Sequence, residues 1–268
     1  MDLGQSVLLG IIEGLTEFVP VSSTGHMVIA SSAMGIAQEE FTKTFTVAIQ
    51  LGAILSVVVL YWRKFIKLND INFYLKLGLA VIPALVFGKL LNDFIDAKLG
   101  NPLAVALSIF FGGVLLLFVD KWFKGGTIKE EKDISFVKAL FIGSWQVLAI
   151  LFPGMSRSAS SIVGGMQQKL TRDAAAEFSF FLAVPTMLAA TGYKLYKYHK
   201  EHGMFTHDQI KLLAVGNIIA FVVALFAIKF FITLVKKYGF RMWGYYRIAL
   251  GAAVIAIYYL KLFPLTVL

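Results

Sequence analysis

The sequence contains no cysteine and little charge. The absence of cysteine excludes disulfide bonds, thiolate metal sites and a cysteine nucleophile, so any catalysis must use oxygen and nitrogen groups or a metal held by carboxylates. Only 15% of the 268 residues are charged whereas 58% are hydrophobic, which leaves too few polar side chains to cover a water-soluble globular protein. We therefore expect a lipid bilayer to be the main solvent of this chain.

The net charge of +9 does not indicate nucleic-acid binding, because lysine and arginine occur in short groups at the ends of apolar runs rather than in one patch. This pattern is typical of membrane topology signals and of contacts with lipid headgroups. The first ten residues contain Asp2 and no basic residue, which is unlike a signal peptide. We therefore expect the N-terminal segment to be retained.

Six apolar runs are long enough, or nearly so, to cross a hydrocarbon core of about 30 Å, which takes about 20 helical residues. Two further apolar stretches, residues 3–36 and 136–169, are interrupted near their middle by proline, glycine, serine and charged residues. Backbone that leaves a helix at membrane depth needs protein or water as its partner, so we interpret both stretches as re-entrant hairpins lining a site. The alternative is two proline-kinked spanning helices. The expected crossings are residues 45–62, 74–91, 103–122, 178–196, 210–235 and 245–263.

An internal repeat relates the two interrupted stretches. A shift of 133 residues aligns Pro20 with Pro153 and Ser23 with Ser156 without gaps. Each half then holds one hairpin and three crossings, and an odd number of crossings inverts the second half relative to the first. The sequence thus predicts an all-α polytopic membrane protein, with six transmembrane helices plus two re-entrant helix-loop-helix hairpins arranged as an inverted-topology repeat. It forms a single membrane domain, 1–268, with halves 1–125 and 126–268.

The distribution of basic residues predicts the orientation. With the N-terminus on a face X, the loops on the opposite face Y carry fourteen lysine and arginine residues against eight on X. By the positive-inside bias, Y is cytoplasmic and the N-terminus lies outside. We interpret Tyr193–Lys200 on face X, where lysine alternates with tyrosine, as an interfacial belt rather than a binding motif. The fourteen are Arg63, Lys64, Lys67, Lys121, Lys124, Lys129, Lys132, Lys138, Lys169, Arg172, Lys236, Lys237, Arg241 and Arg247.

The first interruption carries acids and hydroxyls. Glu13 and Glu17 stand four residues apart, so in a helix they lie on one face. Two carboxylates at bilayer depth are costly unless they share a proton, bind a cation or line water. This favours a Mg²⁺ or Ca²⁺ site or a catalytic base pair over an accidental polar pair facing a neighbouring helix. Groups that suit a phosphate follow the helix end at Pro20: Ser22, Ser23, Thr24 and Gly25.

His26 is the only histidine in an apolar stretch. Alone it would more often be a helix-packing residue, but beside two acids and three hydroxyls it is a candidate proton carrier. The other histidines lie in a polar loop, and we interpret them as solvated: His199, His202 and His207.

The second interruption carries an arginine among serines. The planar and permanently charged guanidinium of Arg157 suits a phosphate, and the alternative is a structural ion pair with Glu13 or Glu17. The second half has Gln146 and Ile150 where the first has acids, so the two halves form one composite site for a phosphate ester. The accompanying hydroxyls are Ser156, Ser158, Ser160 and Ser161.

At these residues the chain resembles the undecaprenyl-pyrophosphate phosphatase family of bacteria, also called the bacitracin-resistance protein family. EGLTEFVPVSSTGH (Glu13–His26) resembles its first motif and PGMSRSASS (Pro153–Ser161) its second. The second departs from the family pattern PG-x-SRSG-[AS]-T, because Ala159 replaces the glycine and Ser161 the usual threonine. The resemblance covers essentially the whole chain, including EFSFFLAVP (Glu177–Pro185).

The resemblance implies hydrolysis of the C55 carrier undecaprenyl pyrophosphate to the monophosphate plus inorganic phosphate. This recycles the carrier for cell-wall synthesis and gives bacitracin resistance. It also implies an outward-facing site in the bacterial inner membrane. By motif, that site comprises Glu13, Glu17, Ser22, Ser23, Thr24, His26, Ser156, Arg157 and Ser161.

Our hypothesis is that Ser23 attacks the terminal phosphorus while His26 handles protons, with attack by His26 itself or by water left open. Arg157 and the serine-rich loops grip the pyrophosphate, and Glu13 and Glu17 hold a divalent cation or the proton. Glu17, Ser23, His26 and Arg157 are thus the expected catalytic residues. The expected substrate-binding residues are Ser22, Thr24, Gly25, Ser156, Ser158, Ser160 and Ser161.

The expected partners are a prenyl pyrophosphate lipid and the bilayer, with no nucleic acid; a homodimer is left open. A rival function is a lipid-carrier flippase or proton-coupled transporter, because inverted repeats with broken helices also build transporters. A third is a structural or assembly protein, for which Arg157→Lys would be harmless.

Overall fold

The computed structural model describes residues 1–67, 70–91 and 102–260, and within these ranges it is helical, with no β-strand beyond one isolated bridge between Ile128 and Leu170. The all-α part of the prediction is therefore confirmed. The elements are α1 (Leu3–Thr16), α2 (Ser23–Ala33), α3 (Glu40–Ala48), α4 (Gln50–Leu60), α5 (Trp62–Ile66), α6 (Ile71–Leu90), α8 (Pro102–Trp122), η1 (Glu131–Asp133), α9 (Phe136–Ser144), α10 (Gln146–Leu151), α11 (Arg157–Gln167), α12 (Arg172–His202), α13 (His207–Tyr238) and α14 (Arg241–Leu260).

Five segments of the described residues are long and apolar enough to cross a bilayer, and they overlap the first five predicted crossings. The protein is therefore a multi-pass membrane protein. The sixth predicted crossing, 245–263, overlaps α14, which is not one of these five, and its residues 261–263 lie outside the described residues. The five are Glu40–Leu60, Ile71–Leu90, Pro102–Trp122, Arg172–His202 and His207–Tyr238.

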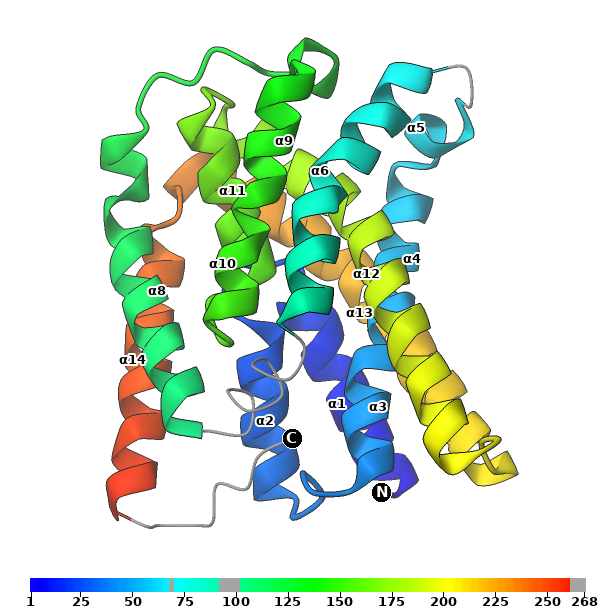
Figure 1. The fold of residues 1–268 in the computed structure, drawn as a ribbon. Helices are drawn as coiled ribbons and strands as arrows, with labels where there is room; N and C mark the ends of the chain where they lie inside the picture. Colours follow the sequence, from blue (N-terminus) through cyan, green and yellow to red (C-terminus); the bar gives the residue numbers. More distant parts are fainter. Residues whose placement is uncertain (68–69, 92–101, 261–268) are drawn as a thin grey trace.

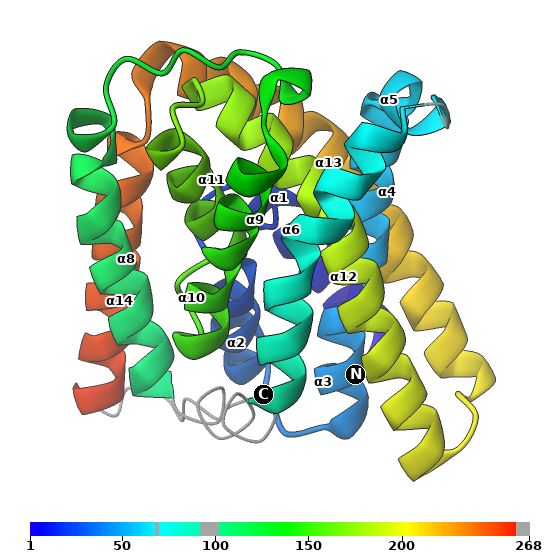
Figure 2. The same ribbon diagram turned by 45° about the horizontal axis from the view of Figure 1, so that its top comes forward.

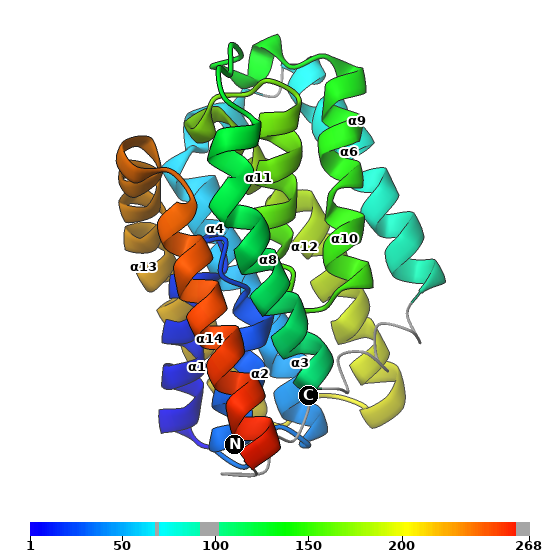
Figure 3. The ribbon, with the colours of Figure 1, turned by 90° about the vertical axis from the view of Figure 1, so that its left-hand side faces the viewer.

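The two interrupted stretches lie toward opposite ends of the bundle. In Figure 1, α1 and α2 occupy the lower half, while α9 begins near the upper end and α10 continues it toward the centre. Figure 3, turned by 90° about the vertical axis, keeps this arrangement, and in Figure 2 α2 still lies below α9. The contacts made by the first half have counterparts in the second. The contact of α1 with α13 corresponds to that of α9 with α6, and the contact of α4 with α13 corresponds to that of α12 with α6. The largest remaining contact joins α8 to α14.

Small residues allow the short helices to lie close to the long ones. A Cβ atom added at Gly14 of α1 would lie 2.7 Å from the backbone oxygen of Ala220 on α13. A Cβ added at Gly143 of α9 would likewise meet the backbone of Ala80 on α6. Without side chains at these crossings, the backbones approach closely enough for van der Waals packing to hold helices together in lipid.

The breaks in the two stretches have the same backbone geometry. Ser22 caps the N-terminus of α2 with φ 73°, and Ser156 caps α11 with φ 74°. The structural equivalent of Ser156 is therefore Ser22, and the alignment with Ser23 is wrong by one residue. The reason is that one residue separates Pro20 from its cap whereas two separate Pro153 from its cap.

Candidate active site

Arg157 connects the two breaks. Its Nη2 donates to Oε1 of Glu17 at 2.8 Å, and its Nη1 donates to the backbone oxygen of Ser179 on α12 at 3.0 Å. Both charged side chains are largely withdrawn from solvent, with exposed fractions of 15% for Arg157 and 5% for Glu17. The Nε of Arg157 is buried without a hydrogen-bond partner among the described residues. The structure thus contains the ion pair that we considered for Arg157, with Glu17 as its partner, and leaves one guanidinium donor for a ligand.

Ser23 contacts the other oxygen of the same carboxylate. Its hydroxyl donates to Oε2 of Glu17 at 2.5 Å, and both residues are buried. A short hydrogen bond from a hydroxyl to a carboxylate is the contact that a nucleophile makes with its general base. Ser23, Glu17 and Arg157 therefore form one continuous cluster across the two breaks.

His26 is held by different groups. Its Nδ1 lies 2.8 Å from the backbone oxygen of Ser22, and its Nε2 lies 2.7 Å from the hydroxyl of Tyr246 on α14. Because a carbonyl oxygen only accepts, Nδ1 carries a hydrogen, and a neutral ring accepts the Tyr246 hydroxyl at Nε2. The stacking of the two rings, with centroids 5.7 Å apart, fixes the imidazole further. Among the described contacts none joins His26 to Ser23, so the group placed to take the Ser23 proton is Glu17.

The hydroxyl groups of Ser158, Ser160 and Ser161 in the second break form hydrogen bonds with other groups of the protein. The Ser158 hydroxyl donates to the backbone oxygen of Val19 at 3.1 Å, which ties the second break to the first. The Ser161 hydroxyl lies 2.7 Å from that of Ser179, the residue whose backbone oxygen accepts from Arg157. Ser160 differs, because it donates to the Ser156 oxygen at 3.0 Å and lines a small separate cavity between α8, α10 and α11.

The caps leave backbone donors at both breaks. The hydroxyl of Ser22 accepts from the backbone N–H of Gly25, and the hydroxyl of Ser156 accepts from that of Ala159, both at 3.2 Å. Other N–H groups of these first turns have no helical partner, and the helix dipole makes them attractive to an anion. A Cβ added at Gly25 would collide with Cδ1 of Ile109 on α8, so the Ile109 side chain would have to move.

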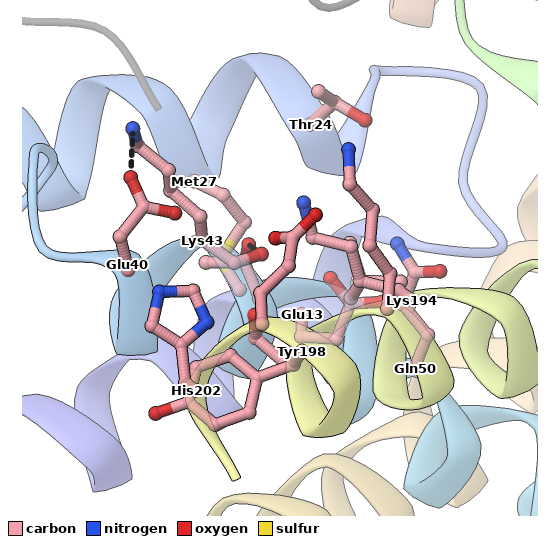
Figure 4. A pocket seen from close by; sticks show the side chains of 14 residues that line it. Glu13, Thr24, Met27, Glu40, Lys43, Gln50, Lys194, Tyr198 and His202 are labelled. Carbon is pink, nitrogen blue, oxygen red and sulfur yellow. Dashed lines mark hydrogen bonds and ion pairs between the residues drawn. The ribbon is translucent and has the colours of Figure 1, made fainter. Parts of the chain in front are cut away.

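Glu13 is fully buried, and neither carboxylate oxygen has a hydrogen-bond partner among the described residues. It lines a cavity of about 310 Å³ together with Thr24 (Figure 4). The rest of the lining comes from α2, α3, α4 and α12: Met27, Glu40, Lys43, Thr44, Thr46, Val47, Gln50, Lys194, Lys197, Tyr198, Glu201 and His202.

The sequence interpretation missed this cavity. Lys194, Lys197 and Tyr198, which belong to the stretch interpreted as an interfacial belt, line this cavity. His202 is exposed, as expected for a solvated histidine, but it also lies at the cavity wall. The available signal was the spacing of three and four residues, which places these polar side chains on one face of α12.

Glu13 and Glu17 also bear on the expected metal. No group of three or more histidine, aspartate or glutamate side chains that could hold a metal ion occurs in the part of the chain that the structure describes. Mg²⁺, however, is commonly held by one or two carboxylates, with water and phosphate oxygens completing its shell. The unpartnered oxygens of Glu13 would fit such a cation, and Glu17 lies close enough to Glu13 to interact with it electrostatically.

Arg247 was assigned to a loop on face Y in the sequence interpretation, and this assignment is wrong. The residue lies within α14, fully buried, and it donates five hydrogen bonds of 2.8 to 3.2 Å to backbone oxygens. Removing it from the loop count lowers the number on Y by one and keeps the excess on Y. The acceptors belong to the first break, the second break and α8: Pro20, Gly154, Met155, Ser108 and Ile109.

Together these features define a multi-pass helical membrane protein in which two broken helices enclose a buried site of acids, hydroxyls and arginine. The chain belongs to the family of the bacitracin resistance protein BacA, whose model matches residues 6–253.

Curated relatives cover nearly the whole chain. An undecaprenyl-diphosphatase of Flavobacterium johnsoniae is 55% identical over 269 residues, covering 100% of both chains. One of Porphyromonas gingivalis is 48% identical and covers 96% of this chain and 97% of its own. One of Aquifex aeolicus is 41% identical and covers 95% of this chain and 98% of its own.

Proposed function

We propose that this protein hydrolyses undecaprenyl pyrophosphate to undecaprenyl phosphate and inorganic phosphate in a bacterial membrane. The observation that carries the proposal is the Ser23–Glu17–Arg157 cluster, with contacts of 2.5 and 2.8 Å, in a chain whose relatives are named for this activity. Hydrolysis returns the lipid carrier to cell-wall synthesis and fits the bacitracin resistance after which the family is named. A flippase or transporter has no support from these relatives.

The geometry supports attack by Ser23 rather than by His26. In this mechanism the Ser23 hydroxyl passes its proton to Glu17 as its oxygen bonds to the terminal phosphorus. The bond between that phosphorus and the bridging oxygen breaks, and undecaprenyl phosphate leaves with the electron pair. Glu17 passes its proton to the departing undecaprenyl phosphate and is again a carboxylate. Water then attacks the phosphoserine while Glu17 takes a proton from it, and the bond between phosphorus and the Ser23 oxygen breaks. Glu17 returns this proton to Ser23 as inorganic phosphate is released. Each cycle consumes one water molecule.

The remaining expected residues bind substrate in this proposal. Arg157 offers its free Nε–H to the phosphate while Nη2 keeps Glu17 in place. The N-terminal turns of α2 and α11 contribute backbone N–H groups, and Ser22 and Ser156 shape those turns. His26, fixed by Tyr246, lies beside the first turn and serves as a secondary proton carrier.

A divalent cation at Glu13 and Glu17 would supply charge neutralisation for the pyrophosphate. We expect a chelator to abolish phosphate release and Mg²⁺ or Ca²⁺ to restore it, because Glu13 otherwise keeps two unsatisfied buried oxygens. Hydrolysis by purified protein is measured during a metal titration, with Glu13→Gln as the variant in which the titration midpoint moves to higher concentration. Full activity in chelator would refute the metal site and favour a proton on Glu13.

The finer topology belongs to the same proposal. Six crossings, with α14 as the sixth, and two re-entrant hairpins would form an inverted repeat of halves 1–125 and 126–268. The short helix of each half packs on a long helix of the other half, α1 on α13 and α9 on α6, which supports this arrangement. We further propose that the end of the bundle carrying the N-terminus, and with it the site, faces outward, because basic residues concentrate at the other end.

Ser23→Ala tests the proposed chemistry. We expect kcat/KM for phosphate release from a prenyl pyrophosphate in detergent to fall by about three orders of magnitude, because the nucleophile is lost. Ser31→Ala is the matched control, since Ser31 lies in the same helix, buried, and donates only to backbone oxygens. A denaturing quench of wild-type protein with radioactive terminal phosphate should trap label on Ser23. Absence of phosphate release from wild type would refute the function, and release without trapped label would favour direct attack by water.

A further inference from the structure

The cavity beside Glu13 connects the buried site to one end of the bundle. At its inner end, Glu13 has no exposed surface, and Thr24 belongs to the first turn of α2. At its outer end, Glu201 and His202 are exposed near the end of α12. Its many charged and hydroxyl side chains are unsuited to hydrocarbon, so the cavity holds water or a polar ligand.

Lys194 is the group in this cavity that most needs a ligand. Among the described residues it has no hydrogen bond or ion pair, although it is half-buried. Lys43, by contrast, pairs with Glu40 at 2.8 Å near the outer end. In Figure 4 the side chains of Lys194 and Glu13 extend into the cavity, with Thr24 across from them. A half-buried ammonium without a protein partner favours an anion as its ligand.

The size of the cavity restricts that anion. A volume of about 310 Å³ is at the low end for small-molecule sites and cannot contain a C55 chain. A phosphate group fits it, and phosphate is what the proposed reaction both brings in and releases. Glu40 is paired with Lys43 at 2.8 Å and acts on Lys194 only electrostatically, without a hydrogen bond, so the ammonium donors of Lys194 remain available for a ligand.

We propose that this cavity is a second phosphate-binding site, in which Lys194 and Lys43 hold a phosphate between the Ser23 cluster and the aqueous surface. The inference rests on the proposed function for the identity of its ligand. The phosphate is either the terminal group of the lipid substrate on its way in or the inorganic phosphate on its way out.

Inhibition by inorganic phosphate tests this site. We expect Lys194→Gln, in the full-length detergent-purified protein, to raise the inhibition constant of phosphate about tenfold, as expected for one lost charge-assisted hydrogen bond. Lys43→Gln should have a smaller effect in the same direction, because Lys43 shares its charge with Glu40. Lys200→Gln is the matched control, since Lys200 is exposed on the same helix outside the cavity lining.

The source of the phosphate follows from the Michaelis constant. An increase in the inhibition constant alone assigns the site to released phosphate, and an increase in KM for the prenyl pyrophosphate as well assigns it to the lipid headgroup. Unchanged values of both in Lys194→Gln would overturn the proposal. A phosphate-dependent rise in melting temperature, smaller in Lys194→Gln than in wild type, checks binding without turnover. If wild type fails to hydrolyse the lipid, the proposed function fails, whereas the melting experiment still decides whether the cavity binds phosphate.

Discussion

Replacing Arg157 by lysine should reduce kcat/KM for prenyl pyrophosphate hydrolysis at least a hundredfold. The guanidinium has three simultaneous tasks: it holds Glu17 at 2.8 Å, bonds the Ser179 oxygen at 3.0 Å and keeps its Nε–H for the ligand. An ammonium is a single point charge and cannot direct donors along these separate directions. The loss of one aligned donor from a buried site typically costs two to three orders of magnitude in rate.

Arg172→Lys is the matched control for this experiment. Arg172 begins α12 and pairs with Asp120 at 2.6 Å, with 40% of its side chain exposed. Lysine keeps the charge of this partly exposed residue, which lies outside the Ser23 cluster, so the control should stay within about twofold of wild type. Phosphate release is measured for both variants after size-exclusion chromatography has shown them to be monodisperse. Retention of more than a tenth of wild-type kcat/KM by Arg157→Lys would mean that Arg157 is only a structural partner of Glu17.

The breaks and their chemistry could be predicted from the sequence because the signals are local. Proline, serine and charged residues inside an apolar stretch are uncommon enough to mark a site. Thus Glu17, Ser23 and Arg157, identified by type and position alone, meet in one cluster. The partner of each group could not be derived in this way. The contact of Ser23 with Glu17 rather than His26 depends on how the turn after Pro20 closes, which sequence spacing does not specify.

The cavity lysines and the repeat register depend on tertiary packing. Whether Lys194 faces water, lipid or a cavity is decided by how α12 lies against α3 and α4, and the alternation of lysine with tyrosine does not distinguish these outcomes. A gapless alignment likewise cannot detect the additional residue between Pro153 and its cap, because Ser22 and Ser23 are identical in type. Such errors arise where neighbouring positions are chemically equivalent and only the fold separates them.

Arg247 was missed for a related reason, and it carries the largest expected effect on stability. Its five acceptors are backbone oxygens, which have no sequence signature, and they lie between 92 and 227 residues away along the chain. No carboxylate contacts this arginine among the described residues, so the carbonyl dipoles alone solvate its charge. Because these acceptors include Pro20, Gly154 and Met155, Arg247 holds the two breaks at a fixed separation.

Arg247→Met should therefore lower both stability and activity. We expect a loss of about 3 kcal/mol, because five backbone oxygens lose their donor and a cavity opens between α8 and α14, although removal of a buried charge offsets part of the cost. Thermal unfolding in detergent measures the first effect. Hydrolysis well below the melting temperature measures the second. We expect the hydrolysis rate to fall about a hundredfold, because Glu17 and Arg157 are no longer held at a fixed distance from each other. Arg241→Met, exposed at the start of the same helix, should leave both values unchanged.

Gly112→Ala separates the geometry of this contact from its charge. An added Cβ at Gly112 would lie 2.8 Å from Cζ of Arg247, so the guanidinium must move while its charge remains. We expect the melting temperature and the hydrolysis rate to fall as in Arg247→Met, though by less. Wild-type values in both variants would mean that the breaks keep their positions without Arg247. A loss in Arg247→Met alone would mean that the guanidinium finds equivalent acceptors when displaced, and that its charge, rather than its exact position, is what the two breaks require.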